Sequence, residues 1–186
     1  MFETGKEYEW NLSVGGRDIH LYVYYPKELK SAYPVFINLH GGGFVKGHRQ
    51  QDVVFCRNIC QNACCAVFDI DYHTAPEYRY PYALNEVYDT ASYLWQHAEE
   101  LQLDKTKLVI GGHSAGGNLT LAAAFMAQEK GGFVPAGLLV DYPAVDLEQD
   151  PAEKRGANGP DVKPPIEDCR KYNDWYVDAD KRRDRR

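Results

Sequence analysis

The amino-acid sequence predicts an α/β fold in which a mostly parallel sheet is flanked by helices. Short, nearly continuous apolar runs recur along the chain, as is typical of strands buried on both faces of a parallel sheet. Between these runs lie segments with apolar side chains at three- and four-residue spacings, which indicates crossover helices. The 186 residues are enough for one domain with its own core. We therefore treat residues 1–186 as a single domain.

The elements can be placed one by one. The first is an antiparallel hairpin over residues 8–25, with Gly15 and Gly16 at its turn. Buried strands are predicted at residues 33–40, 63–72, 107–112 and 136–143. Helices are predicted at residues 49–62, 82–101 and 117–130. After the last strand, residues 144–178 read as a candidate cap or excursion segment that ends in a helix over 166–178, and residues 179–186 form a basic tail.

Charge and composition exclude several classes of protein. The net charge is −6, and the tail KRRDRR holds five of the cations, so the rest of the chain is more acidic still and disfavours nucleic acid. No apolar stretch approaches the roughly 20 residues that a membrane span needs. The amino terminus, MFETGKEYEW, lacks the pattern of a secretory signal. We expect a cytoplasmic protein with no nucleic-acid partner.

The five cysteines are Cys56, Cys60, Cys64, Cys65 and Cys169. An odd number in a chain of this size favours reduced thiols over a disulfide framework. Cys56 and Cys60 are one helical turn apart and precede a Cys-Cys pair, which raises the question of a metal. Zinc sites favour CxxC-type spacing, so we expect buried thiols here, and neither a metal nor a cofactor.

Ser114 lies at the centre of Gly112-His113-Ser114-Ala115-Gly116, between a predicted strand and a predicted helix. This is the context of a nucleophile elbow, a strained turn that presents a serine hydroxyl at the carboxyl end of the sheet. A phosphate-binding turn fits less well. Gly42 and Gly47 have the outer spacing of a P-loop, but His48 stands where its lysine should be. We predict that Ser114 is a catalytic nucleophile.

A second glycine-rich turn, His40-Gly41-Gly42-Gly43-Phe44, follows the predicted strand at 33–40. Acyl transfer generates a negative oxygen that needs hydrogen-bond donors fixed in advance. Glycines allow the backbone to approach a substrate with its N–H groups pointing inward. We predict an oxyanion hole formed by the N–H groups of Gly41, Gly42 and Ala115.

The two motifs together resemble the hormone-sensitive-lipase-like branch of the α/β-hydrolase family, whose esterases carry HGGGF and a GDSAGG-type elbow. A third segment, DYHTAPEYRYPYAL (residues 71–84), is similar to that branch's DYRLAPEHPFPAAL, and the likeness covers most of residues 20–145. This sequence differs at His113, where the branch often has Asp, and at His73 and Thr74, where Arg and Leu are usual. The resemblance implies an α/β-hydrolase fold and carboxylic ester hydrolysis.

An activated serine needs a histidine base and an acid that orients it, and in this fold the acid and then the histidine follow the serine. None of the six histidines follows Ser114. The resemblance implies an acid in a segment like DPLRDEG and a later histidine, and nothing after Tyr142 matches either. His40 is expected to be structural, and the side chain of His113 to point away from that of Ser114. Asp141 and Asp146 follow the strand after the elbow, one strand too early for the acid that the resemblance implies, so we assign neither of them as the triad acid.

These observations predict an incomplete α/β-hydrolase that lacks the last strands, with its triad acid and histidine outside this chain. The strand at 136–143 would then be an exposed edge, covered by a second polypeptide or by self-association. The favoured function is a serine esterase or lipase-like hydrolase acting on small acyl esters. Two alternatives stay open: a non-catalytic hydrolase-fold protein that binds a small molecule, as in plant gibberellin receptors of this branch, and an inactive truncated product.

Overall fold

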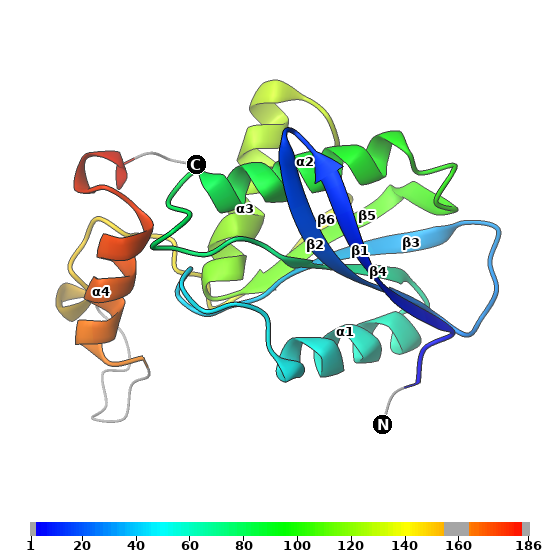
Figure 1. Cartoon of the computed structure of the whole chain (residues 1–186), viewed down its shortest axis with the longest axis horizontal. Coiled ribbons are helices and arrows are strands. Elements are labelled where there is room, and N and C mark those ends of the chain that lie inside the picture. Colours follow the sequence, from blue (N-terminus) through cyan, green and yellow to red (C-terminus); the bar gives the residue numbers. More distant parts are fainter. Residues whose placement is uncertain (1–2, 155–163, 184–186) are drawn as a thin grey trace.

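The computed structural model of the chain describes residues 3–154 and 164–183, and its elements follow the predicted alternation of strands and helices (Figure 1). The described residues form one six-stranded sheet in the order β1-β2-β4-β3-β5-β6. The strands are β1 (Lys6–Val14), β2 (Arg17–Tyr25), β3 (Tyr33–Leu39), β4 (Ala66–Asp71), β5 (Leu103–His113) and β6 (Gly137–Asp141).

The predicted hairpin is confirmed as β1 and β2, which pair antiparallel from Lys6 opposite Tyr25 to Val14 opposite Arg17. Gly15 and Gly16 form the turn with φ of 59° and 73°, a left-handed region that side chains other than glycine rarely enter. β2 is antiparallel to β4, whereas β3 is parallel to both β4 and β5, and β5 is parallel to β6. The mostly parallel sheet is therefore confirmed.

Helices cover both faces of the sheet, with α1 (Gln50–Asn62) on one side and α2 (Tyr82–Gln96) and α3 (Ala115–Lys130) on the other (Figure 1). The strands are buried on both faces because alternate side chains serve two cores. Phe36 and Val67 pack with Cys56 and Cys60 of α1, and Ile37 and its neighbours join the larger core on the side of α2 and α3.

Three predicted boundaries are wrong by three residues or more. One is the start of the strand predicted at 107–112, which begins already at Leu103 as β5. The helix predicted over 82–101 ends at Gln96, and the following residues turn back to β5 with φ of 55° at Gln102. The sequence pattern continued past Gln96 because Ala98 and Leu101, although in this turn, are apolar residues at helical spacing that pack against the core. The strand predicted over 63–72 begins only at Ala66, since Cys64 has φ of 48° and belongs to the turn that leaves α1.

β6 is the edge of the sheet, as the sequence predicts, and β5 is its neighbour among the described residues. Leu138 and Leu139 of β6 are 40% and 42% exposed. Adjacent residues of a strand point to opposite faces, so β6 leaves apolar surface uncovered on both sides of the sheet.

The segment after β6 returns to the carboxyl end of the sheet. It holds the short helix η1 (Pro151–Glu153) and α4 (Ile166–Tyr176), which stands to one side of the sheet in Figure 1. Asp150 accepts two hydrogen bonds of 3.0 Å from the Arg170 guanidinium, which ties η1 to α4.

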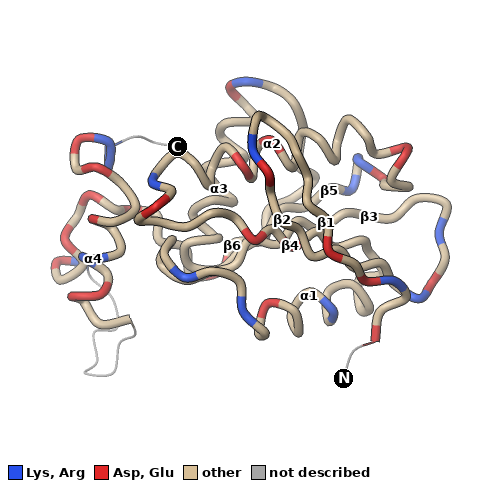
Figure 2. The backbone as a smooth tube through the Cα atoms, viewed as in Figure 1, with Lys and Arg blue, Asp and Glu red and all other residues tan. Residues whose placement is uncertain are grey.

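The start of the predicted basic tail is docked rather than extended. Residues 179–181 form η2 (Ala179–Lys181), Arg182 pairs with Asp174 of α4, and Arg183 pairs with Glu148 at 2.6 Å. Residues 184–186 of the tail lie outside the described residues. Figure 2 shows acidic and basic segments interleaved along α4 and its neighbours. Within residues 3–154 and 164–183, none of the helices has the length and apolarity that crossing a membrane requires.

Candidate active site

Ser114 is the residue between β5 and α3, and its backbone is unusual. Its φ and ψ are 55° and −116°, although it is not glycine, and its side chain makes no capping hydrogen bond to α3. The surrounding chain holds this conformation from both sides: the Ser114 N–H donates to the Asp141 carbonyl at 2.9 Å, and its carbonyl accepts from the N–H of Asn118 at 3.1 Å. The half-buried serine therefore has the strained strand-to-helix backbone that an elbow requires.

The glycines of the elbow allow it to touch the end of β3. A Cβ on Gly116 would lie 2.0 Å from the carbonyl oxygen of Leu39, and one on Gly112 would lie 2.5 Å from the backbone of Gly116. Contacts this short exclude any side chain. Because Leu39 is followed directly by the His40-Gly41-Gly42-Gly43 turn, this packing brings the two glycine-rich motifs together at one edge of the sheet.

The backbone donors of the glycine turn do not all match the predicted oxyanion hole. The Gly41 N–H donates to Nε2 of His113 at 3.1 Å, so it is already engaged. No described residue accepts a hydrogen bond from the N–H of Gly42, Gly43 or Ala115. Of the three predicted oxyanion donors, the N–H groups of Gly42 and Ala115 therefore have no acceptor among the described residues, and that of Gly41 is bonded to His113.

His40 has a structural environment. Its ring is fully buried and stacks on Tyr72 with centroids 4.0 Å apart, and its Nδ1 lies 3.0 Å from the carbonyl of Gly41. The Tyr72 hydroxyl donates to the His40 carbonyl at 2.7 Å. Burial lowers the pKa of His40, against the opposing effects of the Gly41 carbonyl and nearby carboxylates. Tyr72 and His40 together brace the glycine turn.

His73 is paired with a buried carboxylate. Its Nδ1 lies 2.6 Å from Glu86 of α2, and its backbone N–H donates to the other Glu86 oxygen at 2.8 Å. Burial raises the pKa of Glu86, although both hydrogen bonds from His73 act in the opposite direction. A histidine oriented by a carboxylate is the arrangement of a catalytic base and acid, yet neither His73 nor Glu86 hydrogen-bonds Ser114.

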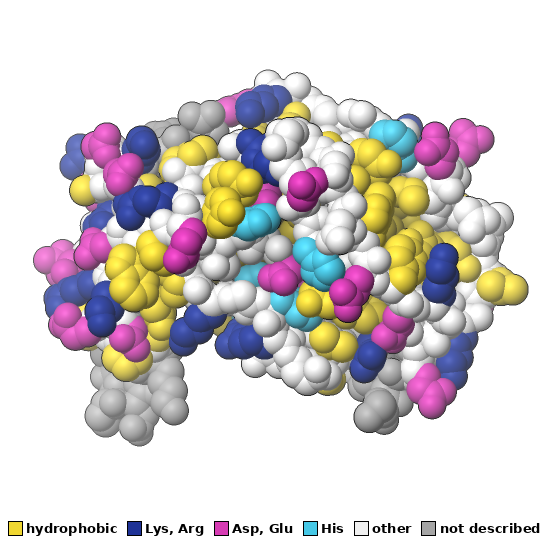
Figure 3. Space-filling view, viewed as in Figure 1, with side chains coloured by type: hydrophobic (Ala, Val, Ile, Leu, Met, Phe, Trp, Pro, Cys, Tyr) yellow, Lys and Arg dark blue, Asp and Glu magenta, His cyan; other side chains and the backbone are white. Residues whose placement is uncertain are grey.

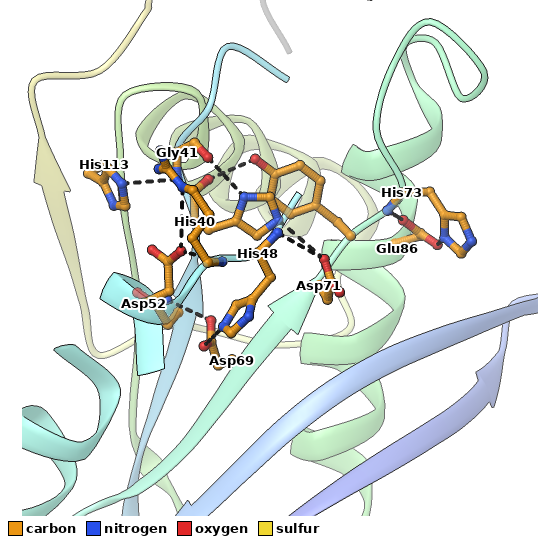
Figure 4. A network of polar contacts seen from close by, with 12 residues as sticks. His40, Gly41, His48, Asp52, Asp69, Asp71, His73, Glu86 and His113 are labelled. Carbon is orange, nitrogen blue, oxygen red and sulfur yellow. Dashed lines mark hydrogen bonds and ion pairs between the residues drawn. The ribbon is translucent and has the colours of Figure 1, made fainter. Parts of the chain in front are cut away.

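A second buried pair joins His48 to Asp69 of β4. His48 Nε2 lies 2.6 Å from Asp69, which also accepts from Nδ2 of Asn38 at 2.7 Å. Burial alone would lower the pKa of His48, but the hydrogen bond and negative charge of Asp69 outweigh it and raise that pKa. Figure 3 shows histidine and acidic side chains gathered near the centre of one face, and Figure 4 shows these pairs from close by.

No described histidine hydrogen-bonds the Ser114 hydroxyl. Each histidine side chain has another partner. In chain order, His20 bonds to Asn11, His40 to the Gly41 carbonyl, His48 to Asp69, His73 to Glu86, His97 to the Tyr93 carbonyl and His113 to the Gly41 N–H. Sequence reasoning did not single out Asp69 and Glu86. The available signal was an acidic residue inside the apolar run AVFDID and another on the buried face of α2.

Aromatic side chains of α4 lie against the glycine turn. Phe44 stacks on Tyr176 with centroids 3.7 Å apart, and a Cβ on Gly43 would lie 2.3 Å from the ring of Tyr172. The Tyr80 N–H donates to the Tyr176 carbonyl at 2.8 Å. The candidate cap segment therefore contacts the loop that carries the free donors.

Three of the four cysteines within residues 56–65 have the buried environment that the sequence predicts. Cys56, Cys60 and Cys65 are buried, and Cys64 is half-buried. Burial raises the pKa of the Cys60 thiol to about 12 and that of Cys65 to about 11. These thiols are protonated core side chains at neutral pH.

A doubly covered, mostly parallel sheet with a serine elbow beside a glycine-rich loop defines a hydrolase-type α/β protein. The sequence pattern of the alpha/beta hydrolase fold matches residues 36–186, and the chain belongs to this family. Its relatives place it in the esterase branch that includes hormone-sensitive lipase. It is 30% identical to the carboxylesterase NlhH of Mycobacterium tuberculosis over 165 residues, which are 88% of this chain and 51% of that protein.

Other similarities agree with this assignment. The chain is 29% identical to hormone-sensitive lipase of Mus musculus over 130 residues, 70% of this chain and 17% of the lipase. The thermostable carboxylesterase EstE1, from a metagenomic library, has the same fold, with a TM-score of 0.89 and 24% identity over 99% of this chain and 63% of EstE1. The chain thus spans about half or less of the curated relatives named here.

Proposed function

We propose that the protein is a carboxylic ester hydrolase that acts on small acyl esters through an acyl-enzyme at Ser114. The observation that carries the proposal is the backbone of Ser114, held at φ of 55° beside a loop with unengaged N–H groups. In the reaction, the Ser114 oxygen attacks the ester carbonyl while a base takes its proton. The alcohol then leaves, and water hydrolyses the acyl-enzyme.

The oxyanion hole in this proposal consists of the N–H groups of Gly42, Gly43 and Ala115. Ala115 is the first residue of α3, so its N–H has no partner within the helix and benefits from the positive end of the helix dipole. Gly41, predicted from the sequence to be a donor, instead anchors the loop to His113. Donors fixed before the reaction stabilise the developing negative charge without reorganisation.

The base and acid are proposed to come from outside these 186 residues. His73 with Glu86 and His48 with Asp69 are histidine–carboxylate pairs, but both histidines are engaged away from Ser114. Without a base, the donors and substrate binding alone leave roughly 10³- to 10⁴-fold of the acceleration over water. The chain by itself is therefore expected to hydrolyse esters weakly.

The contacts of Tyr172 and Tyr176 with the glycine turn support a cap role for the segment 144–178. These rings lie over Gly43 and Phe44, next to the position where an acyl group would be held. An aromatic cover this close to the donors favours small acyl groups over long chains.

A second candidate function is non-catalytic binding of a small molecule. The observation that favours it is the absence, among the described histidines, of one bonded to Ser114. A serine beside fixed oxyanion donors should react with a fluorophosphonate even without its base, although slowly, whereas the serine of a purely binding site should not. One experiment therefore separates the two functions.

The test is the intact mass of the chain after incubation with a fluorophosphonate, for the wild type and for Ser114→Ala. Because the proposed base lies outside this chain, we expect one adduct to form slowly on the wild type and none on Ser114→Ala. We also expect slow release of p-nitrophenol from p-nitrophenyl acetate that needs Ser114. Equal labelling of both proteins would refute the assignment of Ser114 as the nucleophile. No labelling of a folded wild type, together with thermal stabilisation by small esters or acids, would favour the binding function.

A further inference from the structure

His113, the residue before the serine, touches the glycine loop as well as the sheet. We propose, building on the ester hydrolase function proposed above, that His113 is a positioning residue that holds the oxyanion loop in place through the Gly41 N–H, and that it does so only while its imidazole is neutral. The contact joins the last residue of β5 to the loop that follows β3, 72 positions apart in the sequence (Figure 4).

The backbone of the loop lies directly against the imidazole. The Gly41 N–H donates to His113 Nε2 at 3.1 Å, and a Cβ on Gly41 would lie 2.6 Å from Cδ2 and 2.7 Å from Nε2 of the same ring. Glycine is therefore required at residue 41 for this approach. Gly42, whose free N–H belongs to the proposed oxyanion hole, is the next residue along the chain. Fixing Gly41 thus limits where the Gly42 donor can point.

The chemistry of the contact sets the protonation state of the ring. A backbone N–H can only donate, so Nε2 must be the acceptor, and the proton of the neutral ring must be on Nδ1. In the imidazolium both nitrogens carry protons. The contact would then oppose two donors, and Gly41 would be released together with the start of the loop.

The far side of the imidazole is open to proton exchange. His113 is half-buried and lines a hollow of about 270 Å³ between α1 and the β5–β6 edge. Among the described residues, the titratable groups that share this hollow are Asp141 and Tyr142, and the Tyr142 ring centroid is 5.9 Å from that of His113. β3 and α1 contribute only the neutral Asn38 and Gln51 as polar side chains. Protons can therefore reach the ring without disturbing the core.

The experiment follows the Gly41 amide of the 186-residue chain by ¹H–¹⁵N NMR between pH 5 and pH 8.5. We expect its chemical shift to change with the same midpoint as the His113 ring. Its hydrogen-exchange protection factor should fall on the order of tenfold on acidification, as for the loss of one hydrogen bond. The Asn118 amide, which donates to the Ser114 carbonyl, is an internal control and should keep its protection.

Two variants sharpen the result. His113→Gln keeps an acceptor at about the same distance from the backbone but does not titrate, so Gly41 should be protected at both pH values. His113→Phe keeps a ring without an acceptor, so Gly41 should be unprotected at both. In parallel, the rate of fluorophosphonate labelling of the wild type, relative to His113→Gln, should fall about tenfold from pH 8 to pH 5.

A Gly41 amide that ignores the titration of His113, or equal Gly41 protection in the wild type and His113→Phe, would overturn the proposal. So would a labelling ratio that is independent of pH. The NMR measurement needs no reaction at Ser114. A failure of the ester hydrolase proposal would appear as an absence of labelling. A failure of the present proposal would appear as a Gly41 amide whose chemical shift and protection do not change with pH. If His113→Phe does not fold, the wild-type titration alone decides.

Discussion

Gly116, in the first turn of α3, lies so close to the carbonyl oxygen of Leu39 that a Cβ on the glycine would be 2.0 Å from that oxygen. Leu39 is the last residue of β3, and His40 follows with its own carbonyl 2.6 Å from the same Cβ position. This contact joins the helix that starts at the serine elbow to the strand that delivers the glycine loop. The distance between the serine elbow and the glycine loop depends on this contact.

We expect Gly116→Ala to lower the free energy of unfolding by about 3 kcal/mol or to prevent folding, because the backbone of β3 or α3 must move to admit the methyl group. Urea denaturation followed by circular dichroism measures the change. Gly137→Ala is the matched control, since the nearest atom to its Cβ is a Val109 methyl at 3.8 Å. Equal losses in the two variants would show that the close approach is not what matters.

The strained backbone of Ser114 should affect the free energy of unfolding of variants at this position. Ser114→Gly is expected to be more stable than Ser114→Ala by about 1 kcal/mol, because glycine tolerates φ of 55°. The serine side chain makes no capping bond, so neither variant loses one. Thermal and urea unfolding of both variants give the difference. An alanine variant at least as stable as the glycine variant would contradict a strained elbow.

Gly42 is expected to be sensitive in both stability and reactivity. Its φ is 132°, and a Cβ there would lie 2.8 Å from the carbonyl oxygen of Lys46. Gly42→Ala should therefore slow fluorophosphonate labelling of Ser114 by on the order of 10²-fold, the effect of displacing one oxyanion donor, and also lower the unfolding temperature. Gly47→Ala, in the same loop with its nearest contact at 3.8 Å, should label at the wild-type rate.

The His48–Asp69 pair predicts a pH-dependent contribution to stability. Asp69 raises the pKa of His48 in the folded protein, so the stabilisation is fully present below the unfolded value of about 6.5. It is lost as the pH rises through the higher folded pKa. The difference in unfolding free energy between the wild type and His48→Gln should thus be larger at pH 6 than at pH 9. Urea titrations at the two pH values measure it, and a difference that grows with pH would reverse the assignment.

The open edge at β6 predicts association between copies of the chain. Edge strands present unpaired backbone groups, and Leu139 adds an apolar side chain that is 42% exposed. We expect sedimentation velocity to show dimers or larger species for the wild type and a shift toward monomer for Leu139→Lys. Leu29→Lys is the control, because Leu29 is 90% exposed but lies before β3, away from this edge. A monomeric wild type, or equal shifts in both variants, would contradict the prediction.

The sequence by itself determined the order of strands and helices, the hairpin, the serine elbow and the glycine loop. Each of these depends on residues close together in the chain: apolar spacing sets the periodicity of an element, and glycines permit the tight turns at residues 15–16, 41–43 and 112–116. The boundary error near Gln96 has the same origin, because Ala98 and Leu101 keep a helical spacing in a turn.

Only the tertiary structure decided which polar groups meet. Gly41 and His113 are 72 residues apart, His48 and Asp69 are 21 apart, and His73 and Glu86 are 13 apart on different elements. A hydrogen bond requires its two atoms to lie within about 3 Å, and no local pattern specifies that distance. It follows from the order β4-β3-β5 in the sheet, which places the ends of three strands beside one another and engages the Gly41 donor before any substrate can.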